Sequence, residues 1–208
     1  MKKVIIATML LGGGFLAQAQ EVGLQLYSLR DQFKVDVSNT LGLINEWGIT
    51  KIEGGGTYDL PLNDFKALLV KNNLEMVSVG AAFGDLENDI AKVIKNAKDF
   101  GATYVMCAWV PHDDNKWDLE ETKHATSVFN KAGKVLKENG LILAYHPHGY
   151  EFRPHKNGTL FDYMAENSKN FSFKCSKTNF LGYFFINANG SAPSCCAQNT
   201  SNSKEKFF

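Results

Sequence analysis

The feature that most constrains this chain is a repeated alternation of short apolar segments with amphipathic segments between residues 22 and 173. The hydrophobic periodicity predicts strands at 22–29, 50–53, 74–80, 102–110 and 141–145, and helices at 37–48, 62–73, 85–100, 118–139 and 159–168. The fourth strand is apolar nearly throughout, which is typical of a strand covered on both faces. Repeated strand–helix units of this kind imply a parallel sheet with right-handed crossovers, and therefore an α/β fold.

Two α/β architectures share this pattern, an open doubly wound sheet and a closed (β/α)8 barrel. A complete barrel typically needs about 250 residues, and the chain has 208. Nucleotide-binding open sheets usually have a glycine fingerprint after the first strand, but Tyr27-Ser28-Leu29-Arg30-Asp31 stands there. Gly54-Gly55-Gly56 after the second strand lacks the Lys-Ser/Thr pair of a phosphate-binding loop, so a plain turn is the alternative interpretation. Both architectures remain open at this point.

The first 19 residues have the pattern of a secretory signal peptide. Two lysines precede an apolar segment at 4–16, and Ala17-Gln18-Ala19 provides an A-x-A cleavage site. The alternative, a buried N-terminal helix, would have to contain three successive glycines at 12–14. We expect cleavage after Ala19 and a periplasmic or secreted protein. No later segment approaches the roughly 20 apolar residues of a membrane helix, so no membrane span is expected.

Charge and cysteine content exclude several classes of protein. The 22 Lys and Arg residues balance the 22 Asp and Glu residues, so no large positive field attracts a nucleic acid. Of four cysteines, Cys107 lies alone in an apolar segment and the other three lie near the C-terminus. Even in an exported protein, this spacing does not indicate a disulfide framework.

The segment after the fifth predicted strand, His146-Pro147-His148-Gly149-Tyr150-Glu151, is the most informative candidate site. Histidines two residues apart on an extended segment project to the same side, and Glu151 is near enough to turn toward them. Imidazole and carboxylate ligands suit a divalent ion such as Zn²⁺ or Mn²⁺, which could polarise a carbonyl group. Alternatively, one histidine caps the strand or hydrogen-bonds a carbonyl, and the other is solvated.

Glu53 ends the second predicted strand. Because active sites of α/β proteins gather at the carboxyl ends of the strands, Glu53 is a candidate for proton transfer or for hydrogen bonds to sugar hydroxyls. The alternative is an ion pair with Arg30 or Lys51.

Three further candidates lie at other strand ends. Tyr27 follows the first strand, and Trp109 offers a flat apolar face to a sugar ring, although a core position is the alternative. His112 and Asp113 could orient one another in a site, and a solvated loop pair is the alternative.

Three segments, 23–30, 48–53 and above all 144–152, resemble the secreted branch of the sugar phosphate isomerase/epimerase family. This is the xylose-isomerase-like barrel group that also includes apurinic-site endonucleases, and the resemblance covers about residues 21–173. It implies an eight-stranded TIM barrel with a divalent metal (Mn²⁺, Zn²⁺ or Mg²⁺) at its carboxyl mouth. It also implies isomerisation or epimerisation of a small sugar through an enediolate. The roles it implies are metal binding by His146, His148 and Glu151, proton transfer by Glu151 and Glu53, and substrate binding by Tyr27, Trp109 and His112.

The chain departs from the family pattern in two places. Pro147 and Gly149 stand where Asn and Asp are common, and residues 174–208 become rich in Asn, Ser, Cys and Lys. Similar proteins complete the metal site with an acidic residue after strand six, a histidine after strand seven and a glutamate after strand eight, and this chain has none of them. We therefore expect a signal peptide at 1–19, a partial barrel of about five units at 20–173 and an aberrant tail at 174–208. A shifted reading frame or a natural short variant would explain that tail.

An unclosed barrel would leave both sheet edges unpaired, which favours self-association. The leading hypothesis is descent from a metal-dependent sugar isomerase or epimerase, with activity in doubt because most metal ligands are missing. The alternative is a non-catalytic periplasmic carbohydrate-binding protein. Apurinic-site endonuclease activity is disfavoured by export and by the balanced charge.

Overall fold

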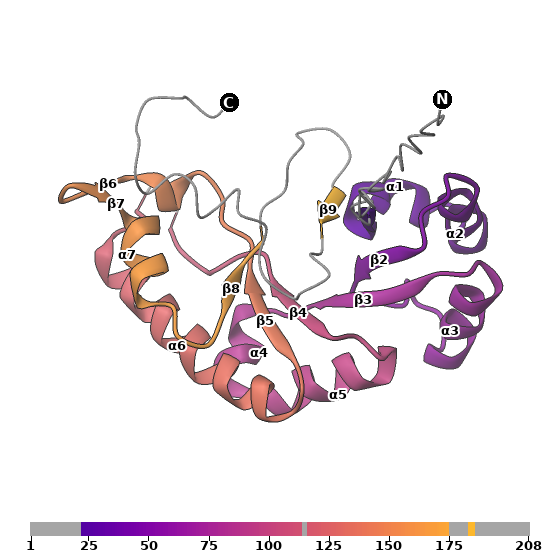
Figure 1. The fold of residues 1–208 in the computed structure, drawn as a ribbon. Coiled ribbons are helices and arrows are strands. Elements are labelled where there is room, and N and C mark those ends of the chain that lie inside the picture. Colours follow the sequence, from indigo (N-terminus) through magenta and orange to yellow (C-terminus); the bar gives the residue numbers. More distant parts are fainter. Residues whose placement is uncertain (1–21, 114–115, 175–182, 186–208) are drawn as a thin grey trace, which may run out of the picture.

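A curved sheet of parallel strands with helices along its outer side forms the body of the protein (Figure 1). The computed structural model describes residues 22–113, 116–174 and 183–185. The predicted signal peptide and nearly all of the predicted tail lie outside these residues. The parallel strands are β1 (Val22–Gln25), β2 (Lys51–Gly54), β3 (Glu75–Gly80), β4 (Tyr104–Cys107), β5 (Ile142–Tyr145) and β8 (Ser172–Phe173).

The sheet order is β8-β5-β4-β3-β2-β1-β9, so consecutive strand–helix units lie side by side as in a barrel. The connecting helices are α2 (Val37–Glu46), α3 (Leu62–Lys71), α4 (Phe83–Asn88), α5 (Ile90–Phe100), α6 (Leu119–Glu138) and α7 (Leu160–Asn167). This arrangement confirms the predicted fold class, an incomplete TIM barrel. The described residues contain six parallel strands instead of the five that were predicted, because β8 pairs with β5.

The hydrophobic core lies between the outer face of the sheet and the helices. Ile52 of β2, Val105 of β4 and Tyr145 of β5 are fully buried, and they belong to one cluster with Phe65 of α3 and Phe129 of α6. Side chains alternate between the two faces of a strand, so the residues between these core positions face the concave side. That alternation determines which side chains can meet at the site.

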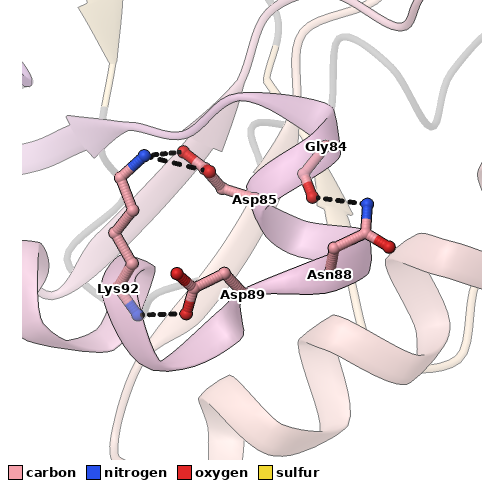
Figure 2. Close-up of polar contacts among 5 residues, drawn as sticks. All are labelled: Gly84, Asp85, Asn88, Asp89 and Lys92. Atoms are coloured by element: carbon pink, nitrogen blue, oxygen red, sulfur yellow. Dashed lines mark hydrogen bonds and ion pairs between the residues drawn. The ribbon is translucent and has the colours of Figure 1, made fainter.

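The helix predicted at 85–100 is two helices, α4 and α5, and the single-helix prediction is wrong. The break falls at Asp89, whose backbone is not helical (φ −145°, ψ 62°) and whose side chain accepts a hydrogen bond from the Lys92 amide at 3.2 Å. Figure 2 shows that Lys92 also reaches back to Asp85 of α4. An aspartate that caps a new helix competes with the continuous helical ladder, which explains the break.

The first predicted strand is also shorter than expected. β1 ends at Gln25, and residues 26–29 form the 3₁₀ turn η1 (Leu26–Leu29), followed by α1 (Arg30–Phe33). Leu26 is fully buried although the chain has turned, so burial of apolar residues in a turn produced the strand-like pattern. Tyr27 consequently leaves the sheet.

The edge of the sheet at β1 is paired, which corrects the expectation that both edges are unpaired. Strand β9 (Tyr183–Phe185) is antiparallel to β1, with Gly23 opposite Phe184. A small antiparallel pair, β6 (Pro154–His155) and β7 (Gly158–Thr159), precedes α7. Within the described residues, no helix has the length and apolar character needed to cross a membrane.

Candidate functional site

Glu53 is the centre of a buried polar network on the concave face of the sheet. Register places Gln25 of β1 opposite Glu53 of β2, and Glu53 opposite Ser78 of β3. Gln25 Nε2 donates to Glu53 Oε1 at 2.9 Å, and Ser78 Oγ donates to Glu53 Oε2 at 2.8 Å. Glu53 is only 2% exposed. Three neighbouring strands therefore fix the orientation of one carboxylate at the carboxyl end of β2.

The third donor to Glu53 is the ammonium group of Lys174, which forms an ion pair with Oε1. Lys174 directly follows β8, where its amide donates to Tyr145 O at 2.8 Å. In the sheet, β5, β4 and β3 lie between β8 and β2. The contact therefore reaches across the concave face, and both side chains are almost completely removed from water. Neither partner considered from the sequence is used, because Lys51 pairs with Glu75 and Arg30 lies over Tyr27.

His146 and His148 lie together after β5, as their spacing predicted. Their ring centroids are 5.1 Å apart, in an edge-to-face arrangement. Burial lowers the pKa of His146 to about 4, and the positive charge of Lys174 adds to this shift. The His146 ring is therefore neutral at pH 7. Its Nδ1 is buried and has no hydrogen-bond partner within the described part of the chain, so it is a polar atom suited to a ligand.

Glu151 lies on the other side of the strand from His146. It is fully buried in the 3₁₀ turn η2 (Tyr150–Phe152), where Oε1 accepts the Tyr145 hydroxyl and Oε2 accepts the His148 amide at 2.8 Å. Tyr145 packs against Phe129 of α6 in the layer between sheet and helices, with ring centroids 4.8 Å apart. Burial and the charge of Glu151 raise the pKa of the Tyr145 hydroxyl. Glu151 thus holds the turn after β5 against the core.

Aromatic and imidazole rings form a continuous group after β4 and β5, which we call the ring cluster (Trp109, His112, Trp117, His148 and Tyr150). His112 is its centre, with centroid distances of 4.2 Å to Tyr150, 5.3 Å to Trp117 and 5.8 Å to Trp109. His148 stacks on Tyr150 at 5.4 Å. Trp117 is buried, whereas Trp109 is 54% exposed. The cluster therefore has a buried base and an exposed aromatic face.

Tyr27 and Asp113 stand apart from this cluster. Tyr27 is 68% exposed in η1, and the Arg30 guanidinium lies 4.9 Å from its ring centroid. Asp113 forms an exposed ion pair with Lys116 at 3.1 Å, in agreement with the solvated alternative for that loop. His112 instead contacts the Val110 carbonyl through Nδ1 at 2.7 Å.

The donors in the described residues do not fit a complete site for a divalent metal. No group of three His, Cys, Asp or Glu side chains in residues 22–113 and 116–174 has the geometry to hold one. His146 offers an unpartnered nitrogen. Glu151, however, is hydrogen-bonded to Tyr145 on the helix side, and Glu53 is already paired with the Lys174 ammonium.

Sequence reasoning missed Lys174 and Ser78. Ser78 had a readable signal, since it is a hydroxyl within the apolar strand predicted at 74–80. Lys174 had none, because it falls at the start of the segment expected to be a tail, and its partner is 121 positions away.

No family model matches this sequence, and no curated protein matches it. Solved structures do match its fold. A sugar phosphate isomerase/epimerase from Parabacteroides distasonis is 19% identical with a TM-score of 0.64, over 74% of this chain and 67% of that one. A second such protein from the same species is 22% identical with a TM-score of 0.60, over 74% and 68%. An AP endonuclease, family 2, from Brucella melitensis is 14% identical with a TM-score of 0.51, over 66% and 61%.

The chain thus spans about two thirds of the length of the two isomerase/epimerase structures. At these identities the likeness concerns the fold, and it agrees with the strand order and the curved sheet described above. The predicted resemblance is confirmed at that level: this chain has the TIM-barrel fold of the sugar phosphate isomerase/epimerase structures, in an incomplete form.

Proposed function

We propose that this chain binds a small sugar at the carboxyl ends of its strands and moves a proton at the carbon next to the sugar carbonyl. The observation that carries the proposal is the buried Glu53 network, whose Lys174 also lowers the pKa of the neutral His146. From His146, ring contacts through His148 and the ring cluster lead to the exposed face of Trp109. Aromatic faces and buried polar groups are the usual elements of a sugar site. The likeness to sugar phosphate isomerase/epimerase structures supports the same reaction class.

In this proposal Glu53 is the proton-transfer group. A carboxylate has about four acceptor positions, and Gln25, Lys174 and Ser78 use three of them. The remaining position, on Oε2, would accept the proton from carbon. Glu53 would take the proton from the carbon next to the carbonyl and return it, on the same face, to the former carbonyl carbon through an enediolate. The proton of the neighbouring hydroxyl would pass to the former carbonyl oxygen, so that the sugar is isomerised with no net loss of protons. The Lys174 ammonium, which is bound to the same carboxylate, would stabilise the negative charge that develops on the substrate oxygen.

His146 and the ring cluster would orient the substrate. The unpartnered Nδ1 of His146 can exchange a hydrogen bond with a sugar hydroxyl, and the exposed face of Trp109 can stack against a sugar ring. Glu151 has a structural task in this proposal, because its oxygens already accept the Tyr145 hydroxyl and the His148 amide.

The test is exchange of carbon-bound hydrogen in D₂O, followed by proton NMR on a panel of ketoses and aldoses with and without phosphate. We expect protein-dependent loss of the proton next to the carbonyl, and loss of this exchange in Glu53→Gln. Glu75→Gln is the matched control, since Glu75 is an exposed carboxylate at the start of β3. Exchange that survives in Glu53→Gln would contradict the role of Glu53.

A second candidate is sugar binding without chemistry, and the burial of Glu53 favours it. With 2% exposure and three donors, that carboxylate is held as a structural group would be. Sugar-dependent tryptophan fluorescence that is lost in Trp109→Ala and kept in Trp47→Ala, in a chain without exchange activity, would support this candidate. Trp47 is a matched control because it is equally exposed, at the end of α2.

We also propose, as the sequence suggests, that the protein is exported through residues 1–19. N-terminal sequencing of the secreted protein would test this directly, with a mature chain that begins at residue 20 as the expected result.

A further inference from the structure

The residue that follows the sixth strand departs from the family pattern in charge. The resemblance implies an acidic metal ligand there, and this chain has Lys174 directly after β8. The Lys174 ammonium is bound to Glu53 across the concave face. The Lys174 amide is bound to the carbonyl of Tyr145, the residue before His146, and the ammonium charge helps to lower the pKa of His146. One positive side chain therefore lies beside both groups that could bind a cation at this mouth.

We propose that the Lys174 ammonium takes the place of a bound metal ion between Glu53 and His146, at the carboxyl ends of the strands. In that position it prevents divalent ions from binding. Its charge balances the buried Glu53 carboxylate, which would otherwise lack a counter-charge. A divalent ion that approached Glu53 would have to displace the ammonium and would be repelled by it at short range in a poorly solvated site.

Two contacts and the burial of the pair support this assignment. Lys174 Nζ binds the same oxygen of Glu53, Oε1, that accepts Gln25, so this oxygen is fully used. The position of Lys174 is fixed by strand pairing, because its amide donates to the Tyr145 carbonyl at 2.8 Å. Its side chain is almost as buried as that of Glu53, so water screens the pair little.

The proposal predicts a latent metal site. When Lys174 is replaced by an apolar side chain of similar length, Glu53 loses its counter-charge and His146 keeps its unpartnered Nδ1. A carboxylate and an imidazole nitrogen are suitable ligands for Zn²⁺, Co²⁺ or Mn²⁺, and water can complete the coordination. Lys174→Met should therefore gain an affinity for divalent ions that the unaltered chain lacks.

The experiment is titration of the full chain with Co²⁺ and with Zn²⁺, followed by absorption spectroscopy and calorimetry. We expect Lys174→Met to bind one ion at least about tenfold more tightly than the unaltered chain, because a neighbouring positive charge has been removed. The gain should disappear in Lys174→Met combined with Glu53→Gln or with His146→Ala. Lys51→Met is the matched control, since Lys51 forms its ion pair with Glu75 instead.

Two results would overturn the proposal. One is an unaltered chain that already binds one divalent ion in a manner that depends on both Glu53 and His146. The other is a folded Lys174→Met that binds no more tightly than Lys51→Met. If circular dichroism shows that Lys174→Met is unfolded, Lys174→Gln replaces it with the same expected gain, and the titration of the unaltered chain needs no variant. Sugar is absent from these titrations, so failure here is distinguishable from failure of the proposed function.

Discussion

The Glu53–Lys174 ion pair should be one of the strongest single couplings between distant parts of this chain. It joins the end of β2 to the end of β8, and both side chains are nearly buried. Loss of one partner from a buried pair costs about 3–5 kcal/mol, because the other charge stays buried without compensation. In Lys174→Met, Glu53 would keep its bonds from Gln25 and Ser78. We therefore expect a loss of about 3 kcal/mol in the free energy of unfolding.

A double-mutant cycle measures the coupling itself. In the Lys174→Met and Glu53→Gln double variant no uncompensated charge remains, so the two losses should not add. We expect a coupling energy of about 2–4 kcal/mol from urea unfolding followed by circular dichroism. The surface pair Lys51–Glu75, treated in the same way, should give less than about 1 kcal/mol. A Glu53–Lys174 coupling as small as that of the surface pair would show that burial does not strengthen this ion pair.

Three further predictions concern groups around the site and the core. Glu151→Gln should lower the free energy of unfolding by about 1.5–3 kcal/mol, since glutamine can accept only one of the two hydrogen bonds that Glu151 accepts. Urea unfolding measures this loss, and an unchanged midpoint would contradict the prediction. Burial raises the pKa of Cys107 from 9.0 to about 11, so stability should be complete below pH 9 and fall as the pH rises to 11, where the unfolded thiol ionises first. Peptide mapping should find Cys107 unmodified by iodoacetamide at pH 8 in the folded chain; modification at the rate of the unfolded chain would show that it is not buried. Gly133→Ala should destabilise the protein by about 1–3 kcal/mol, because the added Cβ would lie 2.1 Å from the Asn170 carbonyl oxygen. The added Cβ of Gly42→Ala in α2 has room, so this variant should be neutral or more stable by up to about 1 kcal/mol. Equal melting temperatures for the two variants would contradict this packing.

The strand–helix alternation was predictable because it depends on local periodicity. Strands with buried faces and helices with an apolar stripe show periods of two and 3.6 residues, and glycine stops mark the ends, as Gly101 does after α5 with a φ of 69°. The break at Asp89 was not predicted, because the apolar stripe runs through both helices and only the capping bond of the aspartate separates them.

The candidate site was predictable in its location and not in its internal contacts. His146, His148 and Glu53 lie at strand ends as expected, since parallel strands place their carboxyl ends at one edge. The partners of the remaining site residues depend on the direction in which each side chain points. Glu151 follows Tyr145 to the helix side, and Lys174 reaches Glu53 only because the sheet curves. Curvature is a property of the whole sheet, and a sequence pattern does not contain it.

The most direct test of the proposed sugar site is the location of a bound sugar in a crystal of the full chain soaked with a ketohexose. We expect density for the sugar against the exposed face of Trp109, with a hydroxyl within hydrogen-bond distance of His146 Nδ1 and with the carbonyl carbon and its neighbour next to Glu53. A sugar bound elsewhere, with this mouth filled only by water, would contradict it.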